Sequence, residues 1–136
     1  MSEQEKVNNV QPLFYIAHKD VNLPKVWGIT SAERLRRVLI KHGALEADEN
    51  GIQKAPQNHP IIVISDDHVY DTPILSGLLS LNHTALEGAE TRQPLAIKTN
   101  GENFKTALEW LNGQDTLPAG TDVKTPLEVA NTFNDA

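Results

Sequence analysis

Four consecutive β-branched apolar residues, Ile61-Ile62-Val63-Ile64, most constrain how this chain can fold. A strand with one face in water alternates apolar and polar side chains, whereas this run has no polar position. We therefore expect a central strand that is covered on both faces, as in α/β domains with a parallel sheet. The run leads directly into Ser65-Asp66-Asp67-His68, so polar side chains stand where the strand should end.

The clearest helix signal lies at residues 31–42. Thr30 and Glu33 have the spacing of a capping box, in which each side chain satisfies a backbone N–H at the start of a helix. Leu35 and Leu39 then recur at helical spacing, and Gly43 follows as a natural stop. This stretch follows an apolar run at residues 13–17 that is typical of a buried strand.

Two further helix starts depend on a threonine followed by a proline. Thr72 is expected to be an N-cap with Pro73 at the first helical position, and Thr125 with Glu128 repeats the capping pattern. Residues 48–60 contain Gly, Asn and two Pro with little periodicity, so we expect a loop with at most a weak strand near Ile52.

The order of all expected elements predicts a three-layer α/β/α domain with a mainly parallel sheet. Residues 1–10 are interpreted as a flexible leader and residues 11–136 as one α/β domain. The remaining expected elements are short strands at 44–47, 84–87 and 95–98, helices at 102–112 and from 126 to about 133, and a loop at 114–124.

Composition excludes several classes of protein. The 136 residues contain no cysteine, which excludes disulfide scaffolds and thiolate metal sites. The formal net charge of −6 disfavours a protein that coats nucleic acid, because phosphate neutralisation requires excess Lys and Arg. No apolar run approaches the roughly 20 residues of a membrane-spanning helix, and residues 1–9 lack the apolar stretch of a secretory signal. We therefore expect a cytoplasmic domain.

Candidate functional residues follow the two most apolar strands. Ligands of open α/β sheets bind at the carboxyl ends of the strands. Asp66 and Asp67 are well placed there to hold Mg²⁺, which commonly takes one or two protein carboxylates and completes its shell with water and phosphates. The alternative is that either aspartate only caps the turn before the next helix. His68 is a candidate ligand or general base, or a hydrogen-bonded packing residue.

The loop from His18 to Gly28 is the second candidate region. Lys25 is a candidate phosphate ligand, with solvation as the alternative. Trp27 can stack on a base or close the loop against the core. The sequence contains no zinc-ligand spacing, no Walker phosphate loop and no Gly-x-Ser-x-Gly elbow.

The stretch Ile61-Ile62-Val63-Ile64-Ser65-Asp66-Asp67-His68-Val69-Tyr70-Asp71 resembles the strand and metal-binding motif of nucleotidyltransferases with the GT-A-like, Rossmann-type fold. The most similar members are cytidylyltransferase-type domains attached to membrane-embedded CDP-alcohol phosphatidyltransferases, in which a segment like residues 27–37 follows the first strand. The resemblance implies that Asp67 binds Mg²⁺ with Asp66 nearby, and that Lys25 meets the nucleotide phosphates. His18, Trp27 and Gly28 would then belong to the nucleotide-binding loop.

By this resemblance the chain would bind an NTP, with CTP favoured, and Mg²⁺. It would transfer the nucleotidyl group to a phosphorylated alcohol or sugar, with Asp67 and Lys25 as catalytic residues. Its setting would be phospholipid biosynthesis, with a membrane-embedded phosphatidyltransferase as partner, and at the inner face of the membrane if the sequence is part of a longer chain.

Two alternatives stay open. The first is a non-catalytic domain of the same fold that acts as a binding or tethering module for such a membrane enzyme. The family's first loop is rich in glycine, whereas residues 17–23 of this chain contain none, which favours this alternative. The second is an unrelated small α/β regulatory domain in which the Asp66-Asp67 pair is structural.

Overall fold

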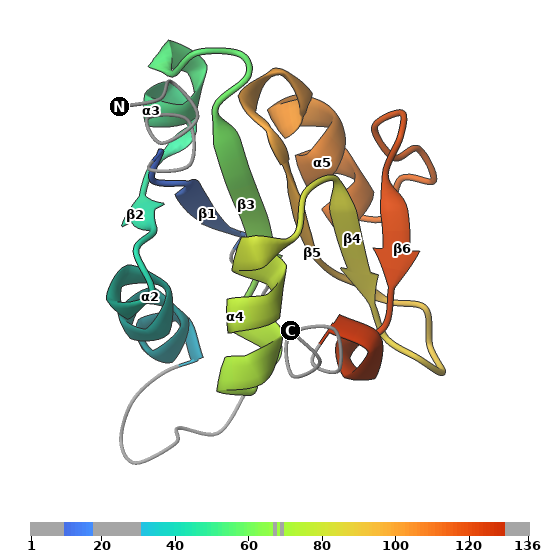
Figure 1. Cartoon of the computed structure of the whole chain (residues 1–136). Helices are drawn as coiled ribbons and strands as arrows, with labels where there is room; N and C mark the ends of the chain where they lie inside the picture. The colour runs from blue at the N-terminus through green and yellow to red at the C-terminus, as the bar shows by residue number, and fades with distance from the viewer. Residues whose placement is uncertain (1–9, 18–30, 67, 69, 130–136) are drawn as a thin grey trace, which may run out of the picture.

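A single six-stranded sheet with helices on both faces organises the chain (Figure 1). The computed structural model describes residues 10–17, 31–66, 68 and 70–129. In chain order the elements are β1 (Leu13–Ala17), α2 (Ser31–Lys41), β2 (Leu45–Glu46), α3 (Glu49–Lys54), β3 (Pro60–Ser65), α4 (Thr72–Ser80), β4 (Thr84–Glu87), β5 (Pro94–Asn100), the 3-10 turn η1 (Gly101–Asn103), α5 (Phe104–Leu111) and β6 (Asp122–Lys124).

The strand order is β2-β1-β3-β5-β4-β6. β1 runs parallel to both β2 and β3, and β4 runs parallel to β6. β5 runs antiparallel to β3 and to β4, so it alone is reversed in this sheet. The expected α/β class with a mainly parallel sheet is therefore confirmed.

The central strand β3 is buried on both faces, as its apolar run predicted. All four residues from Ile61 to Ile64 have no solvent exposure. Ile62 and Ile64 pack into a core beneath α2 and α4, which lie on the same side of the sheet (Figure 1). Ile61 and Val63 pack into the second core, beneath α3 and α5. The helices therefore form the two outer layers of a three-layer domain.

The helix expected at 31–42 is confirmed as α2, and its buried face contains Leu35 and Leu39. Thr30 of the first expected capping box lies outside the described residues, whereas the second capping box is confirmed. The Thr125 N–H donates to Glu128 Oε1 over 2.9 Å, and the Glu128 N–H donates to Thr125 Oγ1 over 3.4 Å. Residues 126–129 are helical.

The loop predicted over residues 48–60 is wrong in its first half, where α3 forms. Asp48 is its N-cap and accepts a 2.7 Å hydrogen bond from the Gly51 N–H. Ile52 anchors the helix in the core with 2% exposure. The cap and this one anchor outweigh the low helix propensity of Asn50 and Gly51.

Three smaller expectations also need correction. Asp71, not Thr72, is the N-cap of α4, so Thr72 already lies within the helix. The helix expected from residue 102 begins with η1, and α5 proper starts at Phe104. The loop expected at 114–124 ends in the three-residue strand β6, which among the described strands pairs with β4 alone and leaves Val123 44% exposed. Such a strand has no apolar run to reveal it.

Residues 1–9 of the expected leader lie outside the described residues, as does the last helix beyond residue 129. Among the described helices, none has the length and apolar character needed to cross a membrane.

Candidate functional site

The carboxyl ends of β1 and β3 lie side by side at one edge of the sheet. Ala17, the last residue of β1, is in register with Ser65, the last residue of β3. The Asp66 N–H extends this pairing by donating to the Ala17 carbonyl over 3.2 Å. The segments that follow the two strands in the sequence therefore leave the sheet from neighbouring points.

The strand order also reverses at this place. From β1 the chain proceeds to β2 on one side, and it later returns to β3 on the other side. In open α/β sheets, ligand sites form outside the carboxyl ends of strands at such a reversal. This edge is therefore the candidate functional site.

Tyr70 holds the end of the segment that follows β3. Its side chain is 2% exposed, and its hydroxyl lies 2.9 Å from the Ser65 carbonyl and 3.1 Å from the Leu95 carbonyl, both in donor geometry. The side chain of Tyr70 thus contacts the last residue of β3. The His68 ring lies 6.2 Å from the Tyr70 ring, between centroids, at a tilt of 50°.

Arg34 connects this segment to α2. Its Nη1 donates a hydrogen bond to the Tyr70 carbonyl, across 36 positions of sequence. Arg36 points elsewhere and forms a two-point pair with Glu46 of β2, with Nε–Oε1 and Nη2–Oε2 distances of 2.7 and 3.1 Å. This pair raises the pKa of Arg36, chiefly through the hydrogen bond. Of these two arginines, only Arg34 contacts the candidate site.

Of the predicted site residues, Asp66 lies at this edge, partly buried, directly after β3. Its proposed companions, His18, Lys25, Trp27, Gly28 and Asp67, lie outside the described residues. The structure therefore places the start of each predicted loop and one of the two aspartates.

Two other carboxylates are candidates for a second metal ligand by sequence position alone. Asp122 begins β6, which lies three strands from β3, or about 14 Å at the usual strand spacing. Asp115 lies in the exposed segment after α5. Asp122 is therefore not a companion of Asp66. Within the described ranges, no three His, Asp or Glu residues are grouped so that they can hold a metal ion.

Sequence reasoning missed the roles of Tyr70 and Arg34. Both residues act through hydrogen bonds to backbone carbonyls that are distant in sequence. No local pattern marks such contacts, because they depend on how α2 and the segment after β3 pack on the sheet.

Comparisons with family models, with curated proteins and with solved structures found no match to this chain.

Proposed function

We propose that the edge formed by the ends of β1 and β3 binds a nucleoside triphosphate together with Mg²⁺, with CTP the favoured nucleotide. The observation that carries this proposal is the pairing of Ala17 with Ser65. It brings the starts of both candidate loops together where the strand order reverses. One loop contains Lys25 and Trp27, and the other contains Asp66 and Asp67.

The residues present suit Mg²⁺, because this ion needs only one or two protein carboxylates when phosphates complete its shell. Asp66 and Asp67 would hold it. The ion supplies neutralisation of phosphate charge when it is bound. Arg34 holds the backbone of the same segment through the Tyr70 carbonyl. Lys25 adds a cation for the phosphates from the segment after β1.

The activity proposed for this site is nucleotidyl transfer to a phosphorylated alcohol or sugar. A phosphate oxygen of the acceptor forms a bond to the α-phosphorus, and the bond from this phosphorus to the bridging oxygen of pyrophosphate breaks. Support comes from the α/β class of the fold and from the motif that begins at Ile61, which resembles that of GT-A-like nucleotidyltransferases.

A second candidate is a non-catalytic domain of the same fold that binds a ligand or tethers to a membrane-bound phosphatidyltransferase. The absence of glycine from residues 17–23 favours it. Small residues in such a loop let backbone amides approach the base and the phosphates closely, so a loop without glycine is less suited to hold a nucleotide for transfer.

Nucleotide binding is tested by thermal unfolding with Mg²⁺ and each of CTP, ATP, GTP and UTP. A nucleotide at 100 times its Kd should add about 2.7 kcal/mol to the free energy of unfolding. Asp66→Asn and Asp67→Asn should each remove the Mg²⁺-dependent part of this gain. Asp122→Asn is the matched control, because its carboxylate lies three strands away.

No stabilisation by any nucleotide at millimolar concentration would contradict the proposal. Pyrophosphate release from CTP in the presence of phosphorylated alcohols, such as glycerol 3-phosphate, separates the two candidates. Release indicates the enzyme, whereas binding without release indicates the non-catalytic domain.

A further inference from the structure

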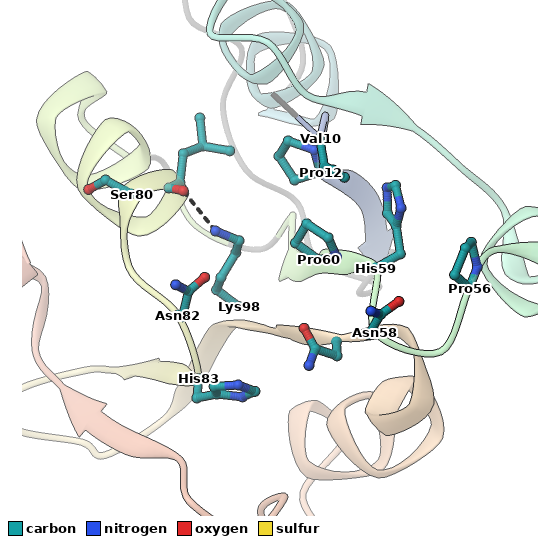
Figure 2. A pocket seen from close by; sticks show the side chains of 12 residues that line it. Val10, Pro12, Pro56, Asn58, His59, Pro60, Ser80, Asn82, His83 and Lys98 are labelled. Atoms are coloured by element: carbon teal, nitrogen blue, oxygen red, sulfur yellow. Dashed lines mark hydrogen bonds between the residues drawn. The ribbon is translucent and has the colours of Figure 1, made fainter. Parts of the chain in front are cut away.

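A cavity of about 700 Å³ opens at the opposite edge of the sheet, where β3 begins and β5 ends (Figure 2). Pro60 and Asn100, which are paired across these two strands, both line it. Along β3, Pro60 lies five residue steps, or about 17 Å of strand, from Ser65. The volume lies within the usual range of small-molecule sites. The polar side chains of interest here are Asn58, His59, Asn82, His83, Lys98 and Asn100.

Lys98 brings a buried cation to the wall of this cavity. The residue is 4% exposed, and its Nζ donates to the Leu79 and Leu81 carbonyls at the end of α4, over 2.7 and 2.9 Å. An ammonium group has three N–H donors, so these two bonds leave one donor for another acceptor. Among the described residues that line the cavity, no Asp or Glu balances this charge.

His83 adds a polar atom whose hydrogen-bonding capacity is unused. Its Nδ1 is buried and has no hydrogen-bond partner within the described part of the chain. A buried polar group left in this state costs about 1–3 kcal/mol, and native proteins usually satisfy such groups. The residue also has a φ of 49°, a conformation that few side chains adopt readily. Figure 2 shows Asn82 and Pro60 on either side of Lys98, and His83 beyond the end of Lys98 that is away from its ammonium group.

Three asparagines and a second histidine complete the polar lining. The side chains of Asn58, Asn82 and Asn100 each offer N–H donors and a carbonyl acceptor. The Nε2 atom of His59 lies 2.7 Å from the Gln11 carbonyl oxygen. The lining thus combines one cation with groups that suit hydroxyls and amides.

We propose that this cavity binds a small polar molecule that carries one carboxylate or phosphate group. The Lys98 ammonium holds the anionic group, and the His83 ring and the asparagines contact the hydroxyl or amide groups of its body. The single lysine matches one anionic group rather than a triphosphate. The site is therefore independent of the nucleotide proposed at the other edge.

The test adds three probes with a similar three-carbon polyol body to the whole chain near neutral pH, without nucleotide. NMR measures their binding. Glycerol 3-phosphate carries a phosphate, glycerate carries a carboxylate and glycerol carries no charge. We expect saturable shifts of the Lys98 and His83 side-chain signals with at least one anion at millimolar concentration. Whichever anion binds more tightly identifies the anionic group.

Two variants connect the shifts to the proposed residues. Lys98→Met should weaken binding about tenfold or more, since a hydrogen bond to a charged group is lost. His83→Asn should weaken binding severalfold, because the ring that lines the cavity is lost. Asparagine tolerates positive φ, so His83→Asn keeps the backbone even if Lys98→Met fails to fold. Arg92→Asn is the matched control, because Arg92 is exposed, also has positive φ at 55° and does not line the cavity.

Three results would overturn the proposal. They are the absence of shifts with both anions at tens of millimolar, shifts by glycerol as large as those by the anions, and unchanged affinity in His83→Asn.

Discussion

At the scale of single residues, Lys98 and Tyr70 show how buried polar groups of this chain are satisfied by backbone carbonyls. Lys98 donates to the last carbonyls of α4, which are the groups that a helix leaves unpaired at its end. The Tyr70 hydroxyl lies in donor geometry to carbonyls of β3 and of the residue Leu95 in β5. Both side chains therefore connect neighbouring elements by polar contacts inside an apolar environment.

The buried Lys98 should make stability rise with pH. Burial lowers its pKa from the ordinary 10.5 to about 8, because removal from water disfavours the charged form. Between these values the unfolded chain binds more protons than the folded chain, so the free energy of unfolding increases with pH. The cost of burying the charge is fully present below pH 8 and is lost above pH 10.5.

Between pH 8 and 10.5 the free energy of unfolding should rise by roughly 3 kcal/mol, since each unit of difference between the two pKa values corresponds to about 1.4 kcal/mol. Urea unfolding of the native chain and of Lys98→Met at several pH values between 7.5 and 10.5 measures it. The difference between the two proteins cancels the titration of all other groups. Parallel pH profiles for the two proteins would refute the expectation.

At the scale of elements, α3 shows how a short helix forms from a segment with poor helix propensity. It has six residues, including Asn50 and Gly51, and only Ile52 is buried. Its stability depends on the Asp48 cap, on that anchor and on its place over the second core of the sheet. The lack of a continuous apolar face is the reason that periodicity did not predict it.

Asp48→Ala should lower the free energy of unfolding by about 1 kcal/mol, because the Gly51 N–H loses its acceptor. The effect should be local as well as global, so hydrogen exchange at the Gly51 amide should accelerate. Urea unfolding and amide exchange measure the two effects. Asp115→Ala is the control, since this exposed aspartate caps no helix among the described elements. Equal losses in both variants would contradict a role of the cap.

At the scale of the whole molecule, β3 holds the two halves of the core together. Its side chains alternate between the core beneath α2 and α4 and the core beneath α3 and α5. It also pairs with β1 on one side and with β5 on the other. The strand therefore sets the position of the candidate site at its end and of the cavity at its start.

Ile64→Ala should cost about 2–5 kcal/mol of the free energy of unfolding, because a fully buried side chain leaves a cavity between β3 and the helices that cover it. Ile40→Ala is the matched control. Ile40 is 50% exposed on α2, so its truncation should change stability by no more than about 0.5 kcal/mol. Urea unfolding of the three proteins makes the comparison, and a similar cost at both positions would disprove the central role of β3.

The sequence by itself determined the central strand, the helix α2 and the α/β class. Each has a local signal: the unbroken apolar run of Ile61 to Ile64, or the helical spacing of Leu35 and Leu39. The sequence also places Asp66 directly after the central strand, because a residue that follows a strand must lie at its end. These features depend on the nearest residues of the chain.

Only the tertiary structure decided the strand order, the reversal of β5 and the presence of β6. It also decided the pairing of Ala17 with Ser65, the contact of Arg34 with Tyr70 and the cavity around Lys98 and His83. All of these arrangements were decided by the tertiary structure for the same physical reason. Each of these arrangements depends on hydrogen bonds or packing between segments that are distant in sequence, and no periodicity or spacing along the chain encodes them.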